Sequence, residues 1–159
     1  MATEIERKFL IKDESWRTSA HEGIHFRQGY LVDIGPDKIR ASVRVRIEGD
    51  KANINIKSAT LDMLRKEYEY PISLDDAEEM LDKLCIWPLI EKTRYKLDHG
   101  NHTWEIDVFE KDNDGLVVAE LELQATDEAF EKPDWLAEEV TEDARYYNVC
   151  LVSQPYKDW

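Results

Sequence analysis

The chain has few of the features that mark secreted, membrane-spanning or nucleic-acid-binding proteins. Its only cysteines are Cys85 and Cys150, and it begins with a charged segment instead of a secretion signal, so reduced thiols are expected. No apolar run approaches the roughly 18 residues of a membrane helix. Basic residues number 21 against 35 acidic ones, for a net charge of −14, which disfavours non-specific binding to nucleic acid or an anionic membrane. These features predict a cytoplasmic protein that binds neither nucleic acid nor a membrane.

Linkers, repeats and low-complexity tracts are also lacking, so no internal domain boundary is expected. With 159 residues, the chain fits one domain spanning 1–159. Hydrophobic residues make up 42%, which is enough for a core. Charged residues make up 35%, above the usual ~25%. This excess suits a domain with two polar surfaces.

What the chain does contain is a recurring alternation of charged and apolar residues. Successive side chains of a strand point to opposite faces, so Glu4, Glu6 and Lys8 share one face while apolar neighbours take the other. The same pattern groups Arg44 with Arg46; Asn53, Asn55 and Lys57; Arg65, Glu67 and Glu69; Lys92 with Arg94; Glu105 with Asp107; and Glu120 with Glu122.

The alternation predicts eight strands, joined in part by short turns such as Gly49-Asp50 and His99-Gly100-Asn101 that favour antiparallel neighbours. The strands are expected at 3–12, 25–32, 41–48, 51–58, 64–72, 89–98, 102–110 and 116–124. Helices are expected at 75–85 and 142–152, with shorter candidates at 127–132 and 13–20. Many strands and few helices favour a closed antiparallel barrel. Periodicity alone favours a barrel whose charged strand faces point to water, since this is the commoner arrangement of antiparallel sheets. The alternative is a barrel whose charged faces point inward.

The stripes carry a resemblance to a known family. The segment EIERK at 4–8 resembles the N-terminal ExExK signature of the CYTH family, the triphosphate tunnel metalloenzymes. Further similar segments follow in the family's order: VRVR at 43–46, NIK at 55–57, RKEYE at 65–69, EKTRY at 91–95, EID at 105–107, ELE at 120–122 and EVTEDARYYN at 139–148. The resemblance spans nearly the whole chain.

The resemblance implies a fold and an orientation of its charges. The implied fold is α+β and mainly antiparallel β: an eight-stranded closed barrel that forms a tunnel, with charges inside and a few helices packed outside. Charges buried without partners each cost several kcal/mol, so acidic and basic groups, metal and anion together would have to complete the pairing.

The resemblance also implies residue roles around a triphosphate with Mg²⁺ or Mn²⁺, hard cations that choose oxygen ligands. The metal carboxylates would be Glu4, Glu6, Asp107, Glu120 and Glu122, with Glu67, Glu69 and Glu105 as further tunnel acids. The phosphate contacts would be Lys8, Arg44, Arg46, Lys57, Arg65, Lys92 and Arg94. The catalytic groups would be Glu120 or Glu122 beside the attacking water and Lys92 or Arg94 at the phosphoryl oxygens. Tyr30 is either an aid to water or proton transfer or an ordinary packed tyrosine.

The implied activity is metal-dependent hydrolysis of a small-molecule triphosphate, with inorganic tripolyphosphate, cleaved to pyrophosphate and phosphate, as the first choice. An adenylyl cyclase of class IV, a thiamine triphosphatase or another nucleoside triphosphatase stays open. A module that binds polyphosphate or a nucleotide without turnover is the alternative of another class. The sequence leaves the oligomeric state open, a homodimer included. The four histidines show no metal-ligand spacing, and His25 in particular has no carboxylate or cysteine beside it.

Overall fold

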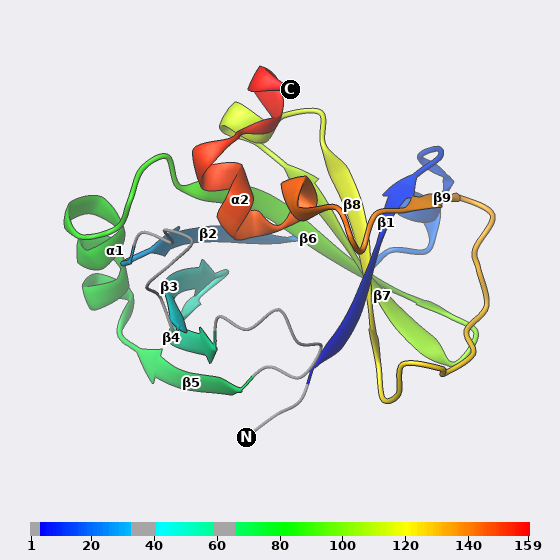
Figure 1. Cartoon of the computed structure of the whole chain (residues 1–159), viewed down its shortest axis with the longest axis horizontal. Helices are drawn as coiled ribbons and strands as arrows, with labels where there is room; N and C mark the ends of the chain where they lie inside the picture. The colour runs from blue at the N-terminus through cyan, green and yellow to red at the C-terminus, as the bar shows by residue number, and fades with distance from the viewer. Residues whose placement is uncertain (1–3, 33–40, 59–65) are drawn as a thin grey trace.

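A computed structural model describes residues 4–32, 41–58 and 66–159. Within them, nine strands form one antiparallel sheet in the order β5-β4-β3-β2-β6-β7-β8-β1-β9 (Figure 1). The strands are β1 (Ile5–Ile11), β2 (Ile24–Tyr30), β3 (Ala41–Glu48), β4 (Lys51–Ser58), β5 (Glu67–Ile72), β6 (Ile90–His99), β7 (His102–Phe109), β8 (Val117–Leu123) and β9 (Leu136–Glu139).

The first eight strands coincide with the eight predicted from alternation. The expected turns also form, and Gly49 and Gly100 adopt the positive φ values, 59° and 60°, that tight hairpins require and glycine tolerates. The ninth strand, β9, was missed. It pairs with β1 and consists of four residues, too few to show an alternating pattern.

The helices are few and short. They are α1 (Leu74–Lys83) and α2 (Asn148–Ser153), with 3₁₀ turns η1 (Ser15–Thr18), η2 (Lys111–Asn113), η3 (Ala144–Tyr146) and η4 (Tyr156–Asp158). Ser73 caps α1, since its hydroxyl accepts a hydrogen bond from the Asp76 backbone N–H at 3.0 Å. The prediction at 142–152 was too long, because η3 and α2 divide that segment. The helix predicted at 127–132 is wrong: no helical residue occurs there.

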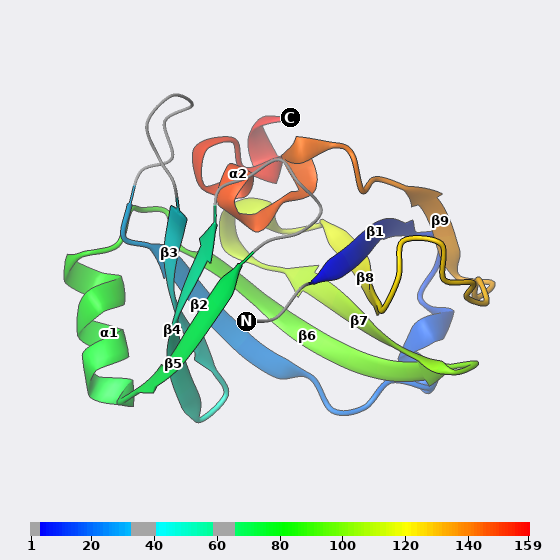
Figure 2. The same ribbon diagram turned by 60° about the horizontal axis from the view of Figure 1, so that its bottom comes forward.

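The sheet curls strongly without closing into the predicted barrel. Among the described residues, no backbone pairing joins the edge strands β5 and β9. The curl instead brings β4 toward the start of β1, although five other strands separate the two in the sheet order, and there Lys57 Nζ lies 2.8 Å from Glu4 Oε2. Figure 2 shows β5 and β1 approaching each other on the near side of this curl. Side-chain ion pairs therefore bridge an opening that backbone hydrogen bonds leave.

The apolar faces of the strands pack mainly on the convex side of the sheet. One cluster, which includes Phe9, Trp16, Trp104 and Trp135, covers β1 and β6–β8. A second places α1 against β3 and β4, with Val45 and Leu81 fully buried. Because the convex side carries the apolar faces, the charged stripes turn to the concave side, as the resemblance implied.

The helix α2 corrects the expectation that helices pack only outside. Its residue Leu151 is buried against Ile90, Phe109 and Val118. The strand registers put Ile90 and Phe109 on the same face as Lys92, and Val118 on the same face as Glu120. This third cluster therefore lies on the concave side, and α2 caps one end of the space that the sheet encloses (Figure 1).

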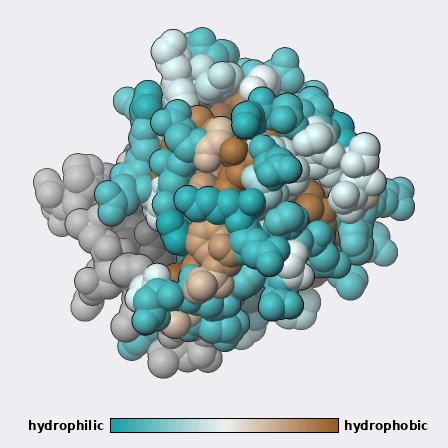
Figure 3. Space-filling view, turned by 90° about the vertical axis from the view of Figure 1, so that its right-hand side faces the viewer, coloured by the Kyte–Doolittle hydropathy of each residue, from teal (hydrophilic) through white to brown (hydrophobic). Residues whose placement is uncertain are grey.

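One face of the molecule is shown in Figure 3 with its side chains coloured by hydropathy. The face on the side of β9 shows mostly hydrophilic residues around a narrow apolar strip (Figure 3). Within the described ranges, the helices are all too short or too polar to span a bilayer.

Candidate functional site

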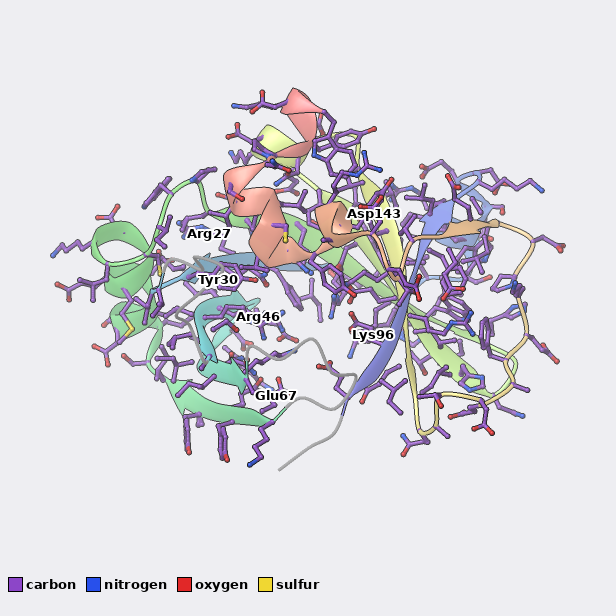
Figure 4. All side chains as sticks on the ribbon, viewed as in Figure 1. Arg27, Tyr30, Arg46, Glu67, Lys96 and Asp143 are labelled. Atoms are coloured by element: carbon purple, nitrogen blue, oxygen red, sulfur yellow. The ribbon has the colours of Figure 1, made fainter. Side chains whose placement is uncertain are left out.

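A cavity of about 410 Å³ occupies the concave side of the sheet. Tyr30, Arg46 and Glu67 reach it from three different strands (Figure 4). The sequence-predicted residues that line it are Glu4, Glu6, Lys8, Tyr30, Arg44, Arg46, Lys57, Glu67, Glu69, Arg94, Glu105 and Glu120. Residues that alternate along strands far apart in the sequence thus meet in one chamber.

Three predicted residues are placed differently, and a fourth is not described. Lys92 and Asp107 are fully buried and lie behind the lining. Glu122 is exposed and lines a neighbouring cavity of about 590 Å³, to which Glu105 also belongs. Arg65 lies outside the described residues. Glu105 therefore marks the boundary where the two cavities adjoin.

Glu120 is the centre of an ion-pair network. One of its carboxylate oxygens lies 2.5 Å from Lys8 Nζ, and the other lies 2.7 Å from Arg94 Nη2. Burial alone would raise the pKa of Glu120, but Lys8 and Arg94 hold it well below its usual range. Lys8 also lies 2.9 Å from Glu6. Glu120 is therefore a permanent anion that fixes the position of two cations.

Asp107 anchors the same network from behind the cavity wall. Its carboxylate accepts two hydrogen bonds from Arg94, both at 2.7 Å, and one from Lys92 at 2.5 Å. Burial opposes ionisation of Asp107, yet Arg94 and Lys92 lower its pKa. Burial and the neighbouring Arg94 lower the pKa of Lys92 to about 8. The two-point contact with Asp107 orients the Arg94 guanidinium in its plane.

Carboxylates are in excess where the start of β1 meets β8. Burial and the nearby Glu120 raise the pKa of Glu6, and burial with Glu4 and Glu105 raises that of Glu122. Glu4 differs, because Lys57 outweighs the effect of burial and lowers its pKa. Raised carboxyl pKa values indicate negative charge that the surrounding cations do not balance. Oxygen donors with uncompensated negative charge fit a hard divalent cation.

The opposite wall of the cavity carries arginines instead. Among the described residues, no carboxylate lies within ion-pair distance of Arg44 or Arg46. Arg46 Nε donates to Gln28 Oε1 at 3.1 Å, and the buried Arg44 Nε has no partner in that part of the chain. Tyr30, 7% exposed, lies beside Arg44, and burial raises the pKa of its hydroxyl. This wall offers positive charge and free N–H donors.

Several lining residues escaped the sequence analysis. Thr141, Tyr147 and Asn148 reach the cavity from the segment that ends in α2, where no strand periodicity points to them. Asn55 was seen only as part of a stripe, yet it is buried and donates to Glu67 at 2.5 Å. Gln28 does not line the cavity but contacts Arg46; it shares the strand face of Tyr30 by alternation, and this signal was available.

One group of metal-type ligands lies outside the cavity. His25 Nε2 is 3.1 Å from Glu110 and 3.6 Å from Glu91, and the three donor atoms lie within 4.8 Å of one another. The spacing along the sequence could not show this group, because pairing between strands, such as that of β2 with β6, brings together residues that are far apart in the chain. All three side chains are partly exposed, and their contacts are those of ordinary ion pairs.

Comparison with known proteins agrees with this architecture. The model of the CYTH domain matches residues 2–154. The chain belongs to the CYTH family. This CYTH protein is 44% identical over 159 residues to the inorganic triphosphatase of Acetivibrio thermocellus, covering 100% of this chain and 99% of the relative. It is 37% identical over 158 residues to the inorganic triphosphatase of Nitrosomonas europaea, covering 94% and 96%.

Solved structures place the fold in the same family. The crystal structure of an inorganic triphosphatase superposes with a TM-score of 0.67 at 34% identity, covering 96% of this CYTH protein and 95% of that chain. A putative adenylate cyclase from Bacillus halodurans superposes with a TM-score of 0.58 at 17% identity, covering 77% and 81%. At that low identity, the second likeness concerns the fold alone. The predicted membership and mainly antiparallel fold are confirmed, with the sheet left open.

Proposed function

We propose that this CYTH protein hydrolyses inorganic tripolyphosphate to pyrophosphate and phosphate with the help of Mg²⁺ or Mn²⁺. One observation carries the proposal: the cavity joins a wall of arginines without carboxylate partners to a wall of carboxylates that includes Glu6, whose pKa is raised, and Glu122 extends this second wall from the adjoining cavity. A polyanion fits the first wall and a divalent cation the second. The two relatives named inorganic triphosphatase support this substrate.

The phosphate contacts are assigned to the cations that line the cavity. Arg44 and Arg46 bind the chain of phosphates with donors that no carboxylate engages, and Arg94 and Lys8 face it from the Glu120 network. Arginine matches phosphate oxygens through its planar fork of donors, and lysine supplies a point charge. Lys57 joins them near Glu4. Lys92 acts behind the wall, since it is fully buried beside Asp107.

The cation is assigned to Glu4, Glu6 and Glu122, with Glu120 as a further oxygen donor. Asp107 is better described as the support of Arg94, because it is fully buried beside Arg94 and Lys92 and does not line the cavity, whereas Glu120 does. A bound divalent cation supplies charge neutralisation at the phosphate oxygens and lowers the pKa of water. Both are what phosphoryl transfer requires, since its catalysis depends on positioning and electrostatics.

The protein's own residues divide the remaining work. Glu122, whose pKa is raised, is the proposed acceptor of the proton from the attacking water, since a base works best with a pKa near the operating pH. Glu120 stays ionised and holds Lys8 and Arg94. Tyr30 stays protonated and acts as a hydrogen-bond donor beside Arg44.

The substrate proposal is tested by turnover. Tripolyphosphate is expected to yield pyrophosphate and phosphate only when Mg²⁺ or Mn²⁺ is present, because the cation would supply the charge neutralisation and the activated water that the hydrolysis needs. Phosphate and pyrophosphate release is measured for tripolyphosphate, ATP, thiamine triphosphate and pyrophosphate, together with cyclic AMP from ATP. Undiminished phosphate release in excess chelator would end the metal-dependent proposal. Cyclic AMP as the main product would favour the cyclase, and binding without any turnover the binding module.

The arginine wall is tested by thermal shift without metal, so that no turnover occurs. A ligand that binds only the folded state adds ~2.7 kcal/mol of stability at a hundredfold excess over its Kd. Arg44→Ala and Arg46→Ala are each expected to lose most of the gain seen with tripolyphosphate, because each removes charge-assisted phosphate contacts worth roughly 1.5–3 kcal/mol.

Arg27→Ala is the matched control, since Arg27 pairs with Glu78 at 2.9 Å and does not line the cavity. It is expected to keep the full shift. Equal shifts in all three variants would remove Arg44 and Arg46 from the proposed site.

The remaining proposals concern context. We propose that residues 1–159 form one domain and that the protein is cytoplasmic. Its proposed partner is a small-molecule triphosphate. Among the described lining residues, Ile5 and Val149 are the aliphatic ones. A lining this polar suits an inorganic chain better than a nucleoside or thiamine group.

A further inference from the structure

Arg46 is held in the cavity wall by two neutral side chains of β2. Its Nε donates to Gln28 Oε1 at 3.1 Å, and its guanidinium carbon lies 4.9 Å from the centre of the Phe26 ring. Gln28 is 0% exposed and Phe26 is 2% exposed. Arg46 itself lines the cavity. The arginine thus rests on a rigid, buried support and faces the space proposed for the substrate.

This support differs from that of the other buried cations. Lys8 pairs with Glu6 and Glu120, and Lys92 and Arg94 pair with Asp107. Arg46 has no such carboxylate among the described residues. Burial, together with the nearby Arg44 and Arg94, lowers the pKa of Arg46 to about 10, so the guanidinium still carries its charge at neutral pH. A half-buried cation without a counter-ion is only partly compensated by solvent and therefore has a reason to bind an anion.

The sheet order explains why neutral residues stand here. β2 lies between β3, which carries Arg46, and β6, which carries Lys92 and Arg94. The register sets Gln28 opposite Arg46 and Phe26 opposite Lys92. The Phe26 ring also lies 5.2 Å from the Arg94 guanidinium carbon. A carboxylate in this position would neutralise the cations on both sides.

The orientation of the Gln28 amide follows from its partner. A guanidinium N–H only donates, so the Gln28 oxygen must face Arg46. The amide nitrogen then points elsewhere, and it has no hydrogen-bond partner among the described residues. Contacts of this kind, an amide oxygen and the face of an aromatic ring, hold a guanidinium without cancelling its charge.

We infer that Gln28 and Phe26 are positioning residues that hold Arg46 through neutral contacts, so that its charge remains available to a phosphate group of the substrate. The inference rests on the proposed function. It assigns these side chains no direct contact with substrate. It predicts that the neutrality of position 28 matters more for substrate affinity than its shape.

Gln28→Glu tests this directly, because glutamate has the shape of glutamine with a charge added. The variant is expected to bind tripolyphosphate roughly tenfold or more weakly, since the new carboxylate takes over Arg46 and repels the anion. Without ligand its melting temperature is expected to equal or exceed that of the wild type, because Arg46 gains a counter-ion. Binding is measured by calorimetry without metal, and turnover in parallel reports KM and kcat. The loss is expected mainly in KM.

Two comparisons keep the test decisive. Gln154→Glu adds the same charge at an exposed position and is expected to bind as the wild type does. Gln28→Glu in an Arg46→Ala background is expected to lose little further affinity, since the effect passes through Arg46. If Gln28→Glu fails to fold, Phe26→Leu, alone and with Arg46→Ala, replaces it in the same cycle.

The outcomes separate the inference from the proposed function. If the wild type binds tripolyphosphate and Gln28→Glu binds within about twofold of it, the inference fails and the function stands. Equal losses with and without Arg46 would also overturn it, as they would show a general disturbance. If the wild type binds none of tripolyphosphate, pyrophosphate and ATP, the proposed function fails and the inference falls with it.

Discussion

Replacing Glu122 with glutamine is expected to lower tripolyphosphate turnover on the order of 100-fold while the fold remains intact. The loss follows from removing a side chain that is both a proposed cation ligand and the proposed proton acceptor, and a 100-fold loss corresponds to about 2.7 kcal/mol of transition-state stabilisation. The fold survives because burial and the neighbouring Glu4 and Glu105 raise the Glu122 pKa. An ionised group with a raised pKa destabilises the folded state, so a neutral isostere is tolerated.

The measurement pairs steady-state kinetics over a Mg²⁺ series with a thermal melt. Glu138→Gln is the matched control, because Glu138 is exposed on β9 and loses the same charge. It is expected to keep wild-type turnover. A Glu122→Gln variant with a near wild-type rate and the same Mg²⁺ requirement would remove Glu122 from the site.

Replacing Asp107 with alanine is expected to cost about 3–5 kcal/mol of folding free energy. Asp107 is 0% exposed and takes hydrogen bonds from Lys92 and Arg94. Its loss leaves two cations side by side in a buried setting with too little negative charge. Typical domains have ~5–15 kcal/mol in total, so this is a large fraction.

Urea unfolding without metal measures this loss. The matched control is Asp82→Ala, on an exposed position of α1, which is expected to change stability by under about 0.5 kcal/mol. An Asp107→Ala protein that is nearly as stable as the wild type, yet inactive, would contradict the supporting role and return Asp107 to the set of cation ligands.

The secondary structure of the sheet was readable from the sequence because alternation is a local property. Each strand from β1 to β8 has enough residues for a period of two to show. β9 has only four. The segment 127–132, predicted as a short helix, has no helical residue. Its Phe130 packs on the cluster of Phe9 and Trp104. Packing between distant segments outweighed local preference there.

The sequence predicted most of the residues that gather at the candidate site. It predicted less well which of them line the cavity and which are buried beside it. Lys92 and Arg94 alternate identically on β6, and the sequence treats them alike. In the structure Arg94 lines the cavity while Lys92 is buried beside Asp107. Position along the curl of the sheet decides this difference, and no local pattern encodes it.

By itself, the sequence determined the strands, the turns, the membership of one face and the family to which the resemblance pointed. Each of these depends on neighbours along the chain. The tertiary structure alone decided which side of the sheet the charges face, since the apolar clusters and α1 occupy the convex side. It also decided which cations keep their charge free. Lys8 and Arg94 meet carboxylates from other strands, whereas Arg46 meets Gln28 and Phe26, because pairing between strands, not spacing within one, sets the neighbours of a buried charge.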